Sequence, residues 1–132
     1  MLDAADPSRV EAVLDWEMTT VGDPMADLGL TLCYWQQYFV GQDGRAAING
    51  VPDLPGWFGR DQLLARYEER TGRRLAHVDW HEILGIFKLA VIVQQIYYRF
   101  HKGQTNDSRF QHFDQRTRGL VEWAAANMER LR

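Results

Sequence analysis

Four acidic residues lie close together near the N-terminus, and their spacing could hold a cation. Asp15, Glu17 and Asp23 fall within nine residues, and Asp27 follows one helical turn later. The segment predicts a short strand, a loop and then a helix opened by Asp23-Pro24, because proline suits the first helical position and aspartate can cap free N–H groups. Mg²⁺ prefers oxygen ligands and often takes only one or two from protein. Two interpretations remain open: a metal-binding corner, or acids that only cap the helix and solvate the loop.

The apolar residues predict a mainly α fold around this corner. Residues 1–15 predict a small β-hairpin remnant, with a turn through 3–8 and a strand near 9–14. Four principal helices are expected at about 25–40, 60–71 and 79–102, and from behind Ser108 to the C-terminus. Such a chain forms one domain, residues 1–132.

Several residues predict where these helices begin, end and pack. Gly72 should end the second helix, and the spacing of Ser108 to Gln111 fits a capping box at the fourth. The third helix is apolar all round in its middle, which predicts a central, buried position. The last helix should bury a series of residues at helical spacing: Phe110, Phe113, Thr117, Leu120, Ala124, Met128 and Leu131. The long segment 41–59 is expected to be a lid or a packed excursion.

Composition narrows the class of protein. The chain of 132 residues is 45% hydrophobic and 12% aromatic, which argues against disorder. A net charge of −3 gives no basis for binding nucleic acid. The apolar stretch Ile83–Val93 is interrupted by Lys88 and is shorter than the roughly 18 residues that span a bilayer, so no membrane partner is expected. No basic-then-apolar segment at the N-terminus indicates export, and a cytoplasmic location is therefore expected.

The cysteine and histidines are interpreted as structural. Cys33 lies in an apolar helical segment, where a small core residue is expected rather than a nucleophile. His77 and His81 have i,i+4 spacing, but His77 should precede its helix and no third ligand is evident. Polar residues also interrupt the third helix, namely Lys88, Gln94, Gln95, Tyr98 and Arg99. They could face a substrate, or the lysine could snorkel while the glutamines bond between helices.

Several segments together resemble a known family. Leu-Asp-Trp-Glu at residues 14–17 is followed by Gly-Asp-Pro-x-x-Asp-Leu at 22–28, and segments 67–73, 87–90 and 94–104 continue the match in order. This series resembles the C-terminal lobe of the aminoglycoside phosphotransferase-like kinases. The nearest branch occurs in bacteria and is fused to acyl-CoA dehydrogenases in animals. The resemblance implies a helical, kinase-like lobe.

The resemblance also implies an activity and roles for individual residues. The parent reaction would move the γ-phosphoryl group of ATP to a small-molecule hydroxyl with Mg²⁺. Asp15 aligns with the metal-binding aspartate, and Asp27 with an aspartate that supports the catalytic loop. Glu17 would be a substrate-side acid or a solvated loop residue. The helices after residue 60 would form much of the acceptor pocket.

The nature of the acceptor stays open between two classes. From Trp80 to Gln104 there is one acid, Glu82, against three basic residues, Lys88, Arg99 and Lys102. A polycationic aminoglycoside would require an acidic wall. The mild basic bias therefore favours an anionic acceptor such as a hydroxyacyl-CoA.

Motifs that the family places before this lobe do not occur in the sequence. It contains neither His-Gly-Asp-x-x-x-x-Asn, which would form the catalytic loop, nor a glycine-rich phosphate loop. We therefore expect a chain that is inactive alone, that binds Mg²⁺ and ATP weakly, and that pairs with itself or with a missing N-terminal lobe. The alternative is a non-catalytic helical module that assembles with itself or with another chain.

Overall fold

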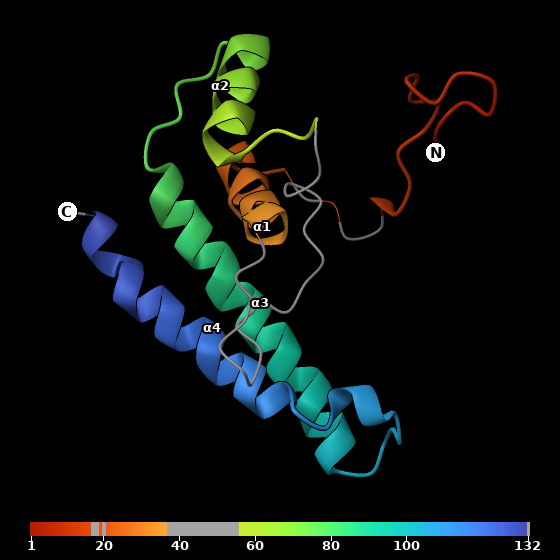
Figure 1. The fold of residues 1–132 in the computed structure, drawn as a ribbon, viewed down its shortest axis with the longest axis vertical. Coiled ribbons are helices and arrows are strands. Elements are labelled where there is room, and N and C mark those ends of the chain that lie inside the picture. The colour runs from red at the N-terminus through yellow and green to blue at the C-terminus, as the bar shows by residue number, and fades with distance from the viewer. Residues whose placement is uncertain (17–18, 20, 37–55, 132) are drawn as a thin grey trace.

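Helix α3 is the central element of the fold, and α1 and α4 both pack against it (Figure 1). The computed structural model describes residues 1–16, 19, 21–36 and 56–131. In that part of the chain the elements are α1 (Pro24–Gln36), α2 (Arg60–Thr71), α3 (Val78–His101), a 3₁₀ turn η2 (Ser108–Phe110), α4 (Phe113–Asn127) and a 3₁₀ turn η3 (Met128–Leu131). The prediction of a mainly α fold with four principal helices is confirmed.

The predicted N-terminal hairpin is present only in irregular form, with a few backbone hydrogen bonds between residues 1–3 and 9–12. Leu2 and Val10 form a single antiparallel bridge, and no longer strand is formed by the described residues. The predicted turn is present, because the Asp3 carboxylate accepts hydrogen bonds from the N–H groups of Ala5 and Asp6 at 2.7 and 3.1 Å. The expected strand at 9–14 is wrong beyond the bridge, since a strand needs a partner along its length.

The helix boundaries follow local signals where the structure describes them. Asp23 precedes α1, and its side chain accepts a hydrogen bond from the Met25 N–H at 2.9 Å. Helix α2 ends as predicted at Gly72, which takes a φ of +65° and donates its N–H to the Glu68 carbonyl at 2.8 Å. The predicted end of the first helix at residue 40 and most of segment 41–59 lie outside the described residues.

Two glycines bring α1 and α3 into close contact. An added Cβ on Gly29 would lie 2.2 Å from the backbone oxygen of His81, and one on Gly85 would lie 2.9 Å from the Cys33 sulfur. Neither distance leaves room for a methyl group. The close crossing therefore depends on glycine at both positions.

The buried side chains form two clusters on either side of this crossing. One joins α1, α3 and α4 through Cys33, Ile86, Leu89, Ala90, Val93, Leu120 and Ala124. The other joins α1 and α2 through Met25, Leu28, Leu32 and Leu64. Helix α2 is thus held on the fold mainly through α1.

The fourth helix begins later than predicted. Asp107, not Ser108, caps the short turn η2, and its carboxylate accepts from the Arg109 N–H at 2.9 Å. The same carboxylate also binds the Arg109 guanidinium, which stabilises the start of η2, and α4 begins separately at Phe113. The expected buried series is correspondingly shorter: Leu120 and Ala124 are buried, whereas Met128 is exposed.

Helix α3 is central, but it is not buried on all sides. Phe87 is 55% exposed, and Leu84 and Val91 are exposed to 41% and 42%. The prediction of a fully buried helix is wrong because α1 and α4 cover only one side of it. Within the described residues, α3 is the one helix long and apolar enough to cross a membrane, a property that the core helices of soluble proteins share.

Candidate functional site

A groove of about 640 Å³ lies between the second half of α3 and the first half of α4. Its lining consists of Phe87, Ala90, Val91, Gln94, Gln95, Tyr98, Arg99, Gln104, Thr117 and Val121. The structure thus brings together the predicted substrate-facing residues Gln95, Tyr98 and Arg99, with Gln94 beside them. Lys88 is exposed on α3 but does not line the groove.

The end of α3 positions the polar end of this groove. Gly103 adopts a φ of +68°, and the N–H groups of Gly103 and Gln104 each donate to a carbonyl of the last helical turn at 2.9 Å. This arrangement is a Schellman motif, which turns the chain sharply back on the helix. Gln104 therefore lies near Arg99, whose carbonyl accepts its N–H.

The charge at this end of the groove is positive. Among the described residues that line the groove, Arg99 is the one charged residue and none is acidic. The Lys102 ammonium lies 5.5 Å from the centre of the Tyr98 ring, which adds a second cation beside the lining. Such a site suits an anionic group better than a polycation.

A second, smaller cavity of about 310 Å³ continues along the same two helices. It is lined by Trp80, Ile83, Leu84, Phe87, Val121, Ala124, Ala125 and Met128, all of them apolar in character. Phe87 and Val121 line both cavities. The groove and the second cavity therefore adjoin at these two residues.

The predicted acidic corner is more open than its spacing suggests. Asp15 is exposed and has a φ of +73°, in the left-handed region that aspartate tolerates better than most residues. Asp23 caps α1, and its carboxylate lies 3.6 Å from Nε2 of His81. Asp27 is exposed in the first turn of α1, and Glu17 lies outside the described residues.

The acidic corner offers Mg²⁺ few ligands from the protein. Among the described residues, no group of three or more histidine, cysteine or acidic side chains could hold a metal ion. Asp15 alone could supply one carboxylate to an ion that keeps its waters and binds phosphate oxygens. Its role as a metal ligand, and that of Asp27 in supporting a catalytic loop, stay predictions.

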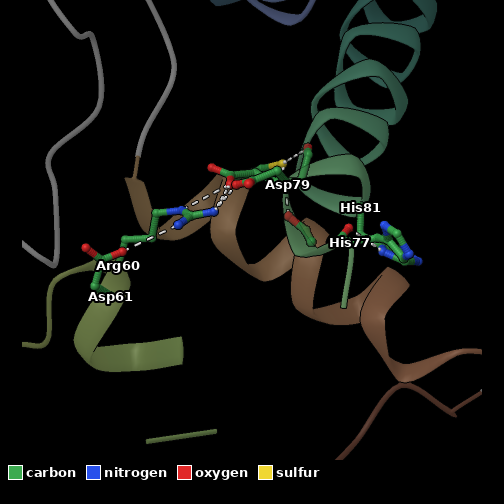
Figure 2. Close-up of polar contacts among 8 residues, drawn as sticks. Arg60, Asp61, His77, Asp79 and His81 are labelled. Carbon is green, nitrogen blue, oxygen red and sulfur yellow. Dashed lines mark hydrogen bonds and ion pairs between the residues drawn. The ribbon is translucent and has the colours of Figure 1, made fainter. Parts of the chain in front are cut away.

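A buried charged cluster, which was not predicted from the sequence, links α2 to α3. The Glu82 side chain is completely buried on α3 and accepts two hydrogen bonds from the Arg60 guanidinium, at 2.7 and 3.1 Å. Asp79 accepts a third from Arg60 at 2.6 Å, and Figure 2 shows Arg60 reaching from α2 toward Asp79. Two features of the sequence could have predicted this cluster. Glu82 is an acid within the apolar part of α3, and Arg60 is a basic residue at the start of the preceding helix.

Cys33 lies beside this cluster and is a core residue, as predicted. It is 1% exposed, and its thiol lies 3.4 Å from the Glu82 carbonyl oxygen. Burial, and secondarily the charge of Glu82, raises the pKa of the Cys33 thiol to about 12. The thiol therefore stays protonated and cannot act as a nucleophile near neutral pH.

We expect Cys33 to resist thiol reagents in the folded protein. Reaction with a chromogenic disulfide at pH 8 should proceed only through unfolding, because both burial and the raised pKa suppress the thiolate. The measurement is the labelling rate against denaturant concentration. A rate close to that of a free thiol in buffer without denaturant would contradict this prediction.

Comparisons with known proteins agree with the resemblance read from the motifs. Residues 1–65 match the model of the phosphotransferase enzyme family. The chain is 31% identical over 104 residues to human acyl-CoA dehydrogenase family member 11, and 34% identical over 101 residues to its mouse counterpart; each match covers 74% of this chain and 13% of the relative. The chicken protein of the same name is 28% identical over 130 residues, which cover 94% of this chain and 16% of the relative. No solved structure gave a significant match.

The motifs, the helical fold and these relatives all indicate the same protein family. The chain spans only 13–16% of the length of the relatives it matches, so the activity of those whole proteins is not transferred to it. The segments Asp15-Trp16-Glu17 and Gly22-Asp23-Pro24 both fall inside the region matched by the family model. The chain belongs to the phosphotransferase enzyme family, of the aminoglycoside phosphotransferase-like type.

Proposed function

We propose that the chain supplies the acceptor-binding wall and one metal ligand of an ATP- and Mg²⁺-dependent small-molecule phosphotransferase in the cytoplasm. The acceptor is an anionic hydroxylated compound, such as a hydroxyacyl-CoA, rather than an aminoglycoside. The observation that carries this proposal is the groove between α3 and α4, where glutamines, Tyr98 and Arg99 converge and the described lining contains no acidic residue.

Each part of the chain has a defined task in this reaction. Mg²⁺, when bound, neutralises charge on the β- and γ-phosphates. Asp15 would hold that ion from the corner before α1. Arg99 binds an anionic part of the acceptor, and Gln94 and Gln95 offer hydrogen bonds that orient it. Oriented binding converts a bimolecular step into an effectively unimolecular one.

We further propose that the chain does not complete the reaction alone. The sequence contains neither the catalytic-loop motif nor a glycine-rich phosphate loop, and phosphoryl transfer depends on both positioning and charge stabilisation. Product formation from ATP, Mg²⁺ and a hydroxylated acceptor should therefore stay at background. Turnover that Asp15→Asn abolishes would refute the proposed inactivity while supporting the phosphotransferase role.

Acceptor binding provides the direct test of the groove. Calorimetry with hydroxydecanoyl-CoA should give a measurable affinity, and kanamycin should give none. Arg99→Gln should weaken the hydroxydecanoyl-CoA affinity by about tenfold or more, because a hydrogen bond to a charged group contributes roughly 1.5–3 kcal/mol. Arg118→Gln is the matched control, since Arg118 is exposed on α4 and does not line the groove. Equal effects of the two substitutions would exclude the groove as the acceptor site.

A second candidate function is a non-catalytic helical module that forms a homodimer. It is favoured by the N-terminal segment, where Leu2, Val10, Val13 and Leu14 are each 58–63% exposed. Exposed apolar side chains gathered on one segment favour contact with another chain. Light scattering at micromolar concentration distinguishes a homodimer from a monomer. A dimer that Val10→Lys dissociates supports this candidate function, and a stable monomer of 15.4 kDa opposes it.

A further inference from the structure

The two cavities between α3 and α4 form one trough whose ends differ in chemistry. The groove has Arg99 at one end, with Lys102 beside Tyr98. The second cavity lies beyond Phe87, and the residues described around it are all apolar. At the helical rise of 1.5 Å per residue, Arg99 and Leu84 are about 22 Å apart along α3.

Side chains in the described part of the chain leave the apolar end of this trough open. Trp80, Leu84 and Met128 line the second cavity and are 48%, 41% and 57% exposed. Phe87 and Val121, which both cavities share, are 55% and 44% exposed. A run of apolar side chains this exposed on one face of a soluble protein commonly marks a binding site.

We infer that the trough binds an amphipathic small molecule, with an anionic head at Arg99 and an unbranched hydrocarbon chain that passes Phe87 into the second cavity. The second cavity would then select ligands by chain length, and Ala125 is the residue that controls its free space. The charge distribution supports this occupant, because the described lining residues carry positive charge at one end and include no acidic residue in either cavity. This inference extends the proposed acceptor site, but it concerns binding and needs no phosphoryl transfer.

The test is a series of straight-chain carboxylates, hexanoate to hexadecanoate, each titrated into the full chain below its micellar concentration. Each added methylene that becomes buried is worth about a fourfold gain in affinity. We expect the dissociation constant to fall at about that rate until the second cavity is filled. A dissociation constant independent of chain length would overturn the inference.

Substitution of Ala125 locates the end of the hydrocarbon chain. Ala125→Trp should remove the gain for the longer carboxylates and leave hexanoate binding unchanged, because its ring would fill the second cavity. Ala126→Trp is the matched control, since Ala126 is exposed on the same helix and lines neither cavity. Loss of affinity for long chains in both variants, or in neither, would overturn the inference.

Two further measurements keep the test decisive if the variant folds poorly. In the wild-type protein, hexadecanoate should shift the NMR signal of the Met128 methyl group and hexanoate should not. Dodecyltrimethylammonium should bind more weakly than dodecanoate, and equal affinities would refute the anionic head. A dimer that Ala125→Trp dissociates, without binding of any carboxylate, would assign the trough to a second copy of the chain instead.

The outcomes also separate this inference from the proposed function. Chain-length selection among the carboxylates, without measurable binding of hydroxydecanoyl-CoA, upholds the trough and counts against the proposed acceptor. If hydroxydecanoyl-CoA binds through Arg99 but the affinities of the carboxylates do not depend on their chain length, the acceptor site is upheld and the trough is overturned.

Discussion

Gly29→Ala is expected to destabilise the protein severely, although alanine is the better helix former. The new methyl carbon would lie 2.2 Å from the backbone oxygen of His81, where no flexible side chain can move aside. Helices α1 and α3 would have to separate, and overpacking of this kind costs about 1–3 kcal/mol or more. We expect a loss of at least about 3 kcal/mol in the free energy of unfolding, against an intrinsic helix gain of about 1 kcal/mol.

Denaturant unfolding followed by circular dichroism measures this effect. Gly22→Ala is the matched control, because a Cβ on Gly22 would meet no atom within 4 Å and its φ is not positive. That variant should retain wild-type stability or gain slightly. A Gly29→Ala protein as stable as Gly22→Ala would show that the two helices do not cross as closely as described.

Arg60→Ala is expected to have a comparable effect through a different cause. The Glu82 side chain is completely buried, and the guanidinium of Arg60 binds it twice while also binding Asp79. Removal of one partner from a buried ion pair costs about 3–5 kcal/mol, because the remaining charge is left in a poorly solvated site. Removal of the Arg60 side chain should also detach the start of α2 from α3, because Arg60 connects the two helices.

A double-mutant cycle with Glu82→Leu separates the ion pair from simple packing. The double variant should lose less stability than the sum of the two single variants, because the buried Glu82 charge is then no longer present without the Arg60 guanidinium. Arg66→Ala is the control within the same helix: its ion pair with Glu69 is exposed and should contribute about 0–1 kcal/mol. Additive losses at Arg60 and Glu82 would contradict a coupled buried pair.

The local sequence determined where most helices begin and end. Asp23-Pro24 predicted the start of α1, and Gly72 the end of α2, because each signal acts through backbone groups within a few residues. The same short-range motifs carried the resemblance to the phosphotransferase family, which the comparisons confirm. Local signals failed at α4, where Asp107 and Ser108 compete for the same cap and the sequence does not rank them.

The tertiary structure decided what these helices expose and what they bury. An apolar helix such as α3 predicts burial, but only its neighbours determine which side is covered, and Phe87 remained exposed. The sequence placed Gln95, Tyr98 and Arg99 on one helix, whereas the groove required α4 to lie alongside. The contact of Gly29 with α3 and the burial of Glu82 against Arg60 join residues far apart in the chain. Such contacts depend on how helices cross, which no short-range pattern encodes.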